Sequence, residues 1–233
     1  MATGISRRTL LLGLGVGLAA TGLGCGGMNP FLMLDYALSG GKATTPAEFE
    51  LKPPDKKKDA RVVVLVSAKT GLPPDLTGVD KMLNAELIRI LTDLTQANEE
   101  KVQVLKMPAL DKFRDETPNW RSANPYDIGK KFEADYMIDV EIQEMDLFKP
   151  GSRGQWLQGR ATVSVNAYDL NKPLKEAAAK WEFPINFPQH GYEREVESRA
   201  QVSTFRMEFI QRIASNVAVK FSATDTQRKR HID

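Results

Sequence analysis

The stretch FEADYMIDVEIQEMDLF, residues 132–148, decides the fold class. Its apolar and polar residues alternate over 138–143, which is typical of a β-strand with one buried and one solvated face. Asp139 and Glu141 lie on the polar face of this strand. The alternation changes phase at Glu144-Met145, where we expect a β-bulge or a bend.

The flanking sequence predicts further strands and helices from the same periodicities. Alternating or β-branched runs indicate strands, and apolar residues at helical spacing indicate amphipathic helices. Pro184 predicts that its strand lies at a sheet edge, because proline has no N–H to donate to a ladder. The expected elements in chain order are a strand over 61–67, a helix over 79–94, a strand over 101–107, an irregular stretch with Pro108 and Pro118, a helix over 125–132, strands over 136–148, 156–170 and 180–186, and a helix over 195–223.

This order, β-α-β-α-β-β-β-α, predicts an α/β (α+β) domain with a mixed sheet of about five strands. We expect helices on one face of the sheet and a long closing helix at the C-terminus. The chain then divides into a signal peptide over 1–24, a cysteine and tether over 25–60, the α/β domain over 61–223 and a basic tail over 224–233. Glycine, proline and lysine accumulate in the second half of the tether, which is typical of an extended spacer.

Cys25 is the only cysteine of the 233 residues, and it follows an apolar, glycine-rich run over 10–20. A run of this length fits the apolar core of an export signal, roughly 7–15 residues, and is shorter than the roughly 20 that cross a bilayer as a helix. Arg7 and Arg8 supply the positive charge that precedes such a core. The first residues therefore predict export from the cytoplasm.

With Gly24-Cys25 at its end, this segment resembles the signal peptide of bacterial lipoproteins. In that family a small residue precedes a cysteine that receives a diacylglyceryl thioether and becomes the first mature residue. The family prefers leucine three residues before the cysteine, where this chain has Gly22. The stretch SRRTLLL, residues 6–12, also resembles a twin-arginine export signal. Two alternatives remain, an ordinary secretory signal with an incidental cysteine and an uncleaved N-terminal anchor.

A second resemblance lies in IGKKFEADYMIDVEI, residues 128–142. It is similar to the helix–Gly-Ala-Asp-Tyr–strand segment of a group of bacterial envelope proteins, with Ala134-Asp135-Tyr136 matching and Glu133 in place of the glycine. That group includes the amino-terminal domain of TolB, the curli secretion lipoprotein CsgG and the lipoprotein activators of penicillin-binding proteins. The resemblance implies an accessory or assembly role in the cell envelope, not a reaction.

The composition argues against several functional classes. The net charge is +2, from 32 basic and 30 acidic residues, so no bulk charge indicates a nucleic-acid partner. One cysteine cannot form an intramolecular disulfide, and two histidines leave little for a zinc site or a histidine-based triad. We therefore expect neither an enzyme nor a bound cofactor or metal.

Few residues are candidates for chemistry. Asp139 and Glu141 are close enough on one strand face to share a proton or a cation, but Arg160, Thr162 and Ser164 occupy the polar face of the next strand. A cross-strand ion pair or plain exposure therefore explains the two carboxylates better. The stretch EREVE, residues 193–197, is interpreted as a charged helix start, and His190 as a loop residue.

The best candidate for contact with a partner is the predicted hairpin tip in KPGSRGQW, residues 149–156. It carries Arg153 and Trp156 where loops between strands meet solvent. We expect a lipoprotein anchored to a membrane through Cys25, facing the periplasm or the exterior, whose domain binds another protein or the envelope matrix. The alternatives are a periplasmic module that binds a small molecule or glycan, and an exported hydrolase that uses Asp139 and Glu141.

Overall fold

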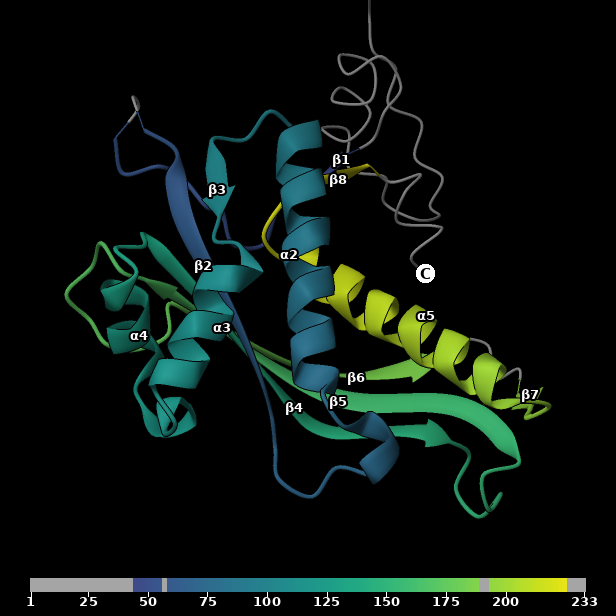
Figure 1. Ribbon diagram of the computed structural model, residues 1–233. Coiled ribbons are helices and arrows are strands. Elements are labelled where there is room, and N and C mark those ends of the chain that lie inside the picture. The colour runs from purple at the N-terminus through teal and green to yellow at the C-terminus, as the bar shows by residue number, and fades with distance from the viewer. Residues whose placement is uncertain (1–43, 56–57, 189–192, 226–233) are drawn as a thin grey trace, which may run out of the picture.

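The computed structural model describes residues 44–55, 58–188 and 193–225. Its centre is a six-stranded mixed sheet with the main strand order β3-β2-β4-β5-β6, and β7 pairs with the start of β5 (Figure 1). β2 runs parallel to β3 and β4, and the remaining pairs are antiparallel. The strands are β2 Ala60–Ala68, β3 Val102–Val104, β4 Tyr136–Phe148, β5 Trp156–Asp169, β6 Ala179–Phe187 and β7 Arg194–Glu195.

Two long helices, α2 (Val79–Ala97) and α5 (Arg199–Ala218), cross one face of this sheet and pack against each other (Figure 1). The apolar side chains of β4 and β5 point to the same face, and Ile138, Val140 and Ile142 are at most 1% exposed. Figure 1 also shows the shorter helices α3 (Met107–Glu116) and α4 (Pro125–Lys131), to the left of α2 in this view. The fold class is therefore the one predicted, an α/β domain with a mixed sheet and a C-terminal helix.

Helix α4 packs on the other face of the sheet, near the start of β4. Gly129 in α4 lies close to Met137 and Leu170, since a Cβ built at Gly129 would come within 3.1 Å of the Met137 Cβ atom. Met137 points away from the α2–α5 face, because successive strand residues alternate between faces. Helix α4 therefore occupies the opposite face, and β4 and β5 leave polar side chains beside it.

Most predicted elements are confirmed, and three are wrong in part. The strand predicted over 101–107 is shorter, because β3 ends at Val104 and α3 begins at Met107. The register of β4 shifts between Ile142 and Glu144, next to the expected bulge. The stretch after β3 is not irregular at its start, because Pro108 lies in the first turn of α3, where the missing N–H is not needed. The closing helix is shorter than 195–223 at both ends. It begins only at Arg199, because the Ser198 side chain accepts a hydrogen bond from the Gln201 N–H and caps it, and it ends at Ala218.

β6 is the edge strand that Pro184 predicts. Pro184 pairs with Thr162 of β5. Because Pro184 has no N–H, this pair is not one of the hydrogen-bonded pairs of the antiparallel ladder, and the Pro184 nitrogen faces the open side. The edge of β6 therefore lacks one of the donors that an added strand would need.

The segment before β2 lies against the domain. The short strands β1 (Thr44–Thr45) and β8 (Thr224–Asp225) pair with each other. Phe49 follows β1 and makes edge-to-face contacts with Tyr136 and Phe221, at ring-centroid distances of 5.8 Å and 6.1 Å. Both ends of the described chain therefore leave the domain at one place.

Candidate functional site

The hairpin between β4 and β5 has a well-defined turn. The Lys149 N–H donates to the Trp156 carbonyl at 2.9 Å, and the Ser152 N–H donates to the Lys149 carbonyl at 3.1 Å. Gly151, Arg153 and Gly154 have left-handed backbones with φ angles of 76°, 52° and 80°. Arg153 is the non-glycine residue among these three, so its backbone carries the strain that glycine avoids.

The side chains at this tip offer one aromatic surface and one exposed cation. Trp156 is 37% exposed, and Arg153 is exposed at the end of the turn. They line a shallow, polar depression of about 570 Å³ together with Lys149 and Gln155. The Lys149 ammonium is held by Glu193 at 2.6 Å. An indole next to a guanidinium is suited to stack on and hydrogen-bond a polar partner.

This tip lies at the end of β4 that is remote from the chain ends (Figure 1). β4 starts at Tyr136, whose hydroxyl donates to the Lys52 carbonyl at 2.8 Å beside the segment that follows β1. From there β4 runs for 13 residues to Phe148. At a rise of about 3.3 Å per residue the two ends are about 40 Å apart. The tip therefore points away from the place where the N-terminal segment enters the domain.

Asp139 and Glu141 lie together on the polar face of β4, opposite Asn166 and Ser164 of β5. Burial raises the pKa of Asp139 to about 6, although the Asn166 side chain, at 3.4 Å, lowers it. Glu141 is half-buried beside it. The pair satisfies the spacing expected from the sequence, and its surroundings bring one carboxyl group close to neutrality near pH 6.

The predicted ion pair across the strands forms with a different carboxylate. Arg160 contacts Asp146, the residue that faces it in the register, at 3.2 Å. Three cavities among the described residues are lined by neither Asp139 nor Glu141. A hydrolase needs a substrate-sized pocket beside its carboxylates, so these cavities give the hydrolase hypothesis no support.

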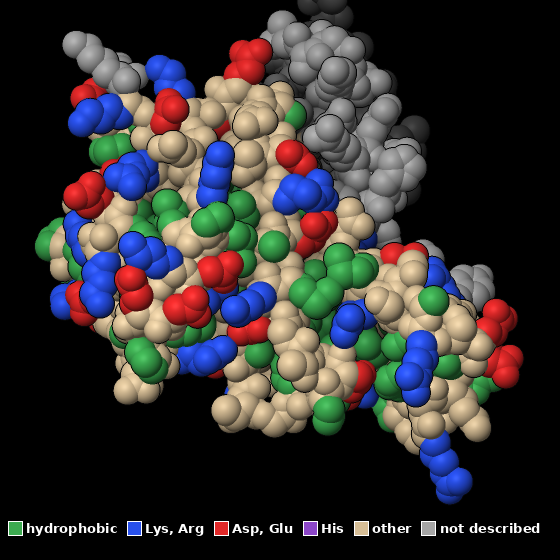
Figure 2. All heavy atoms as spheres, viewed as in Figure 1, with side chains coloured by type: hydrophobic (Ala, Val, Ile, Leu, Met, Phe, Trp, Pro, Cys, Tyr) green, Lys and Arg blue, Asp and Glu red, His purple; other side chains and the backbone are tan. Residues whose placement is uncertain are grey.

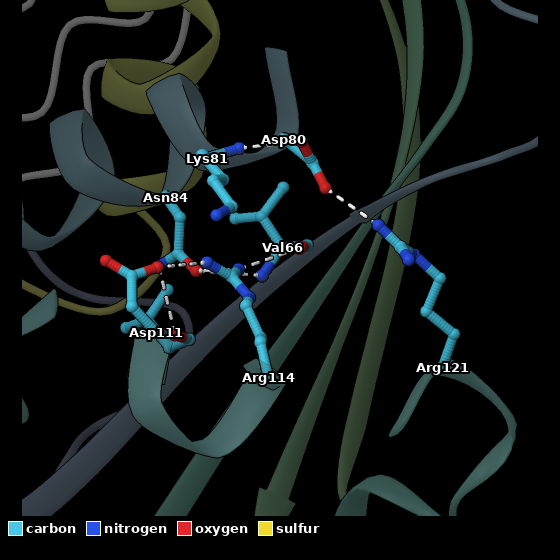
Figure 3. A network of polar contacts seen from close by, with 8 residues as sticks. Val66, Asp80, Lys81, Asn84, Asp111, Arg114 and Arg121 are labelled. Carbon is cyan, nitrogen blue, oxygen red and sulfur yellow. Dashed lines mark hydrogen bonds and ion pairs between the residues drawn. The ribbon is translucent and has the colours of Figure 1, made fainter. Parts of the chain in front are cut away.

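A buried polar network lies where β3 ends (Figure 3). Beyond β3, the edge of β2 has no strand beside it, and side chains take the place of one. The Asn84 side chain accepts from the Val66 N–H at 3.3 Å and donates to the Val64 carbonyl at 3.0 Å. Arg114 donates to the Val66 carbonyl at 3.2 Å and to Asn84 Oδ1 at 2.6 Å.

Burial lowers the pKa of Arg114, whereas the charges of Asp80 and Asp111 raise it. The guanidinium groups of Arg114 and Arg121 both lie near the Trp120 ring, at 5.4 Å and 4.7 Å from its centroid. Because the terminal nitrogens of Arg114 donate to Val66, Asn84 and Asp111, we interpret this network as structural. Sequence reasoning missed it, since the two side chains are 30 residues apart.

The remaining candidates give no site among the described residues. No group of three metal-ligating side chains is found there, and no helix in those ranges is long and apolar enough to cross a membrane. The stretch 193–197 is not a helix start, because it contains β7 and precedes the Ser198 cap. Arg7, Arg8, Gly24, Cys25 and His190 lie outside the described residues.

The face of the molecule that carries α2 and α5 has no patch of a single charge sign among its described residues (Figure 2). Figure 2 shows Lys and Arg side chains interspersed with Asp and Glu over the face that carries α2 and α5. Three large apolar side chains are exposed in the described part of the chain, namely Trp156, Leu174 and Met207. Of these, Trp156 lies at a turn whose backbone is fixed by hydrogen bonds, which makes the hairpin tip the best candidate site.

No protein-family model matches the chain, and no curated protein matches its sequence. Its fold is similar to solved structures at low identity. A lipoprotein of Neisseria meningitidis aligns over 67% of this chain and 99% of its own, with 9% identity and a TM-score of 0.40. A protein of Xanthomonas campestris aligns over 74% and 90%, with 11% identity and a TM-score of 0.42.

The PelC dodecamer of Paraburkholderia phytofirmans aligns over 76% of this chain and 95% of its own, with 13% identity and a TM-score of 0.37. Bacterial lipoproteins are thus among the structures that this chain is similar to. Similarity at this level assigns no function to the chain. The resemblance to the TolB, CsgG and penicillin-binding-protein activator group stays a prediction.

Proposed function

We propose that this protein is a lipid-anchored component of the bacterial cell envelope whose α/β domain binds another protein or the envelope matrix without catalysis. The anchor is Cys25, which the signal over 1–24 presents for lipidation. Acyl chains contribute about 0.8 kcal/mol per buried methylene, so two or more chains hold a protein firmly to a bilayer. The domain faces the periplasm or the exterior.

One observation carries the binding part of this proposal, the placement of the hairpin tip. The N-terminal segment enters the domain beside Tyr136, and the tip with Arg153 and Trp156 lies at the other end of β4. A domain held by its N-terminus at a membrane would present that tip to the surrounding envelope. Exposed aromatic and arginine side chains are enriched where proteins bind each other.

The anchor is tested by Cys25→Ser in the producing cell. We expect the wild-type protein in the membrane fraction and most of the variant in the soluble fraction after cell disruption. A wash with high salt and carbonate separates lipid anchoring from peripheral binding. If the variant stays in the washed membranes, the lipid anchor is wrong.

The binding surface is tested by a photo-crosslinking amino acid placed at position 156 and, as a matched control, at position 174. Both positions are exposed and apolar, but Leu174 lies in the loop between β5 and β6. We expect a discrete crosslinked product in intact cells from position 156 that position 174 does not give. Equal patterns from the two positions would remove the hairpin from the proposal and leave the anchor untouched.

A further inference from the structure

A second groove lies where the N-terminal segment enters the domain. Its volume is about 250 Å³, which is smaller than the roughly 300–1,000 Å³ of pockets for drug-sized ligands. Buried Leu51 and Phe221 contribute to its lining, and Ala47 and Lys101 line it as well. Its exposed lining is more apolar than polar, so it suits one or two apolar side chains of a peptide better than a small molecule.

The chain itself brings an apolar segment to this groove. Ala47 lies two residues after the end of β1, so the residues before Thr44 start near the groove. The segment 31–38, FLMLDYAL, is the apolar run between Cys25 and Thr44. Residues 39–43 connect it to β1, and five extended residues reach up to about 18 Å. The groove is therefore within reach of this run.

The other segment that leaves from the same place does not fit the groove. Beyond β8 the chain continues as TQRKRHID over 226–233, which has three basic side chains and Ile232 as its large aliphatic residue. The groove is rimmed by charges of both signs, including Glu50 and Lys101. Because Glu50 and Glu100 balance Lys52 and Lys101, the charge of the lining favours neither segment. The apolar part of the lining suits the apolar segment better than a tail with three basic side chains.

We infer that residues 31–38 dock in this groove, against its apolar lining beside Leu51 and Phe221. Docking shortens the free part of the tether between Cys25 and the domain. Only residues 26–30 then remain between the lipid and the docked segment. Five residues span at most about 18 Å, so the domain is held close to the bilayer surface. This inference rests on the proposed function only in taking Cys25 to carry a lipid. The docking of residues 31–38 itself needs no anchor.

Pairs of introduced cysteines test the docking in the whole chain carrying Cys25→Ser, so that no other thiol competes. Leu34→Cys is combined with Lys101→Cys at the groove, or with Lys106→Cys as the matched control. Both lysines are exposed and flank the three-residue strand β3, but Lys106 lines a different groove. After mild oxidation we expect the first pair to give at least roughly fivefold more disulfide than the second, because docking raises the effective concentration.

Adding Ala47→Arg to the first pair gives an independent check. Ala47 is half-buried at the groove, so a large side chain there would block the groove without opening the core. We expect the disulfide yield to fall to that of the control pair while the melting temperature stays unchanged. Equal yields from the Lys101 and Lys106 pairs would overturn the inference, as would a yield that Ala47→Arg leaves unchanged. Either result is independent of whether Cys25 carries lipid.

Discussion

The two halves of the sheet differ in how they treat their polar groups. In the parallel half, β2 is covered on both faces, and residues 62–66 are at most 1% exposed. In the antiparallel half, β5 alternates buried residues with half-buried ones such as Ser164 and Asn166. The first half has the hydrophobic run typical of a parallel strand, and the second has the one-sided pattern of an antiparallel sheet.

The halves also close their edges differently. Where β3 ends, the side chains of Asn84 and Arg114 hydrogen-bond to the backbone groups of Val64 and Val66. At the other edge, β6 is protected by Pro184 and by charged side chains such as Glu182. The difference teaches where binding can take place. In the parallel half, buried polar side chains hydrogen-bond to the sheet itself. In the antiparallel half, a polar face and the hairpin tip are left in contact with solvent.

The largest effect is expected from Arg114→Leu in the parallel half. The change leaves the Val66 carbonyl and Asn84 Oδ1 buried without this donor, which costs about 3 kcal/mol of unfolding free energy. Urea denaturation followed by far-UV circular dichroism measures it. Arg121→Leu is the matched control, because that guanidinium is 53% exposed and its ion pair with Asp80 contributes less than about 1 kcal/mol.

If Arg114→Leu were as stable as Arg121→Leu, the network would not close the β2 edge. The two halves would then differ in burial alone. A third variant, Arg114→Lys, sharpens the test. It keeps the positive charge but lacks the planar fork with which the guanidinium reaches both acceptors. We expect that variant to recover less than half of the loss.

A smaller effect is expected from Gly159→Ala in the antiparallel half. A Cβ at this position would lie 2.8 Å and 2.9 Å from the Cδ1 and Cγ atoms of Phe209, a fully buried residue of α5. Overpacking of this kind costs about 1–3 kcal/mol. Thermal and urea unfolding measure the loss, and an unchanged stability would show that α5 is free to shift on the sheet.

Asp139→Asn tests the polar face through its pH dependence. Burial raises the pKa of Asp139 from 3.8 to about 6 in the folded protein, so the folded state holds this proton more tightly than the unfolded state. Stability from this group is therefore present below pH 4 and is lost as the pH rises to about 6, by roughly 2–3 kcal/mol.

We expect Asp139→Asn to equal the wild type at pH 4 and to unfold at a higher urea concentration at pH 7.5. Denaturation curves at both pH values measure the difference. Parallel losses at the two pH values would show that Asp139 stabilises the fold as a carboxylate, and the polar face would then be a satisfied structural surface like the β2 edge.

The sequence predicts one half better than the other for a physical reason. The alternation in β4 and β5 is local, so the strand, the bulge near Glu144 and the edge position of Pro184 follow from spacing alone. Asn84 and Arg114 follow from no local pattern, because their acceptors on β2 lie 20 and 48 residues away. Helix α3 was missed because Pro108 is a helix breaker inside a helix and acceptable in its first turn.

The candidate site, like the fold, could be predicted from the sequence only where its features are local. The turn KPGSRGQW places Arg153 and Trp156 at a hairpin tip, and the structure places them there. Their distance from the N-terminal segment depends on the pairing of β2, β4 and β5, which spacing does not determine. The lipid on Cys25 stays a prediction, since that residue lies outside the described ranges.

Arg153→Gly is expected to have the smallest effect on stability, and it should also weaken binding at the hairpin tip. Its left-handed backbone, with φ at 52°, suits glycine, so the change alters the unfolding free energy by less than about 1 kcal/mol. If the antiparallel half is the binding half, crosslinking from position 156 should nevertheless drop severalfold, because the exposed guanidinium is gone. Lys149→Met is the comparison, since that ammonium is already held by Glu193 and should matter less. Undiminished crosslinking in Arg153→Gly would show that Trp156 makes the binding contact at the tip without Arg153. Unfolding of the variant would show that Arg153 supports the turn itself.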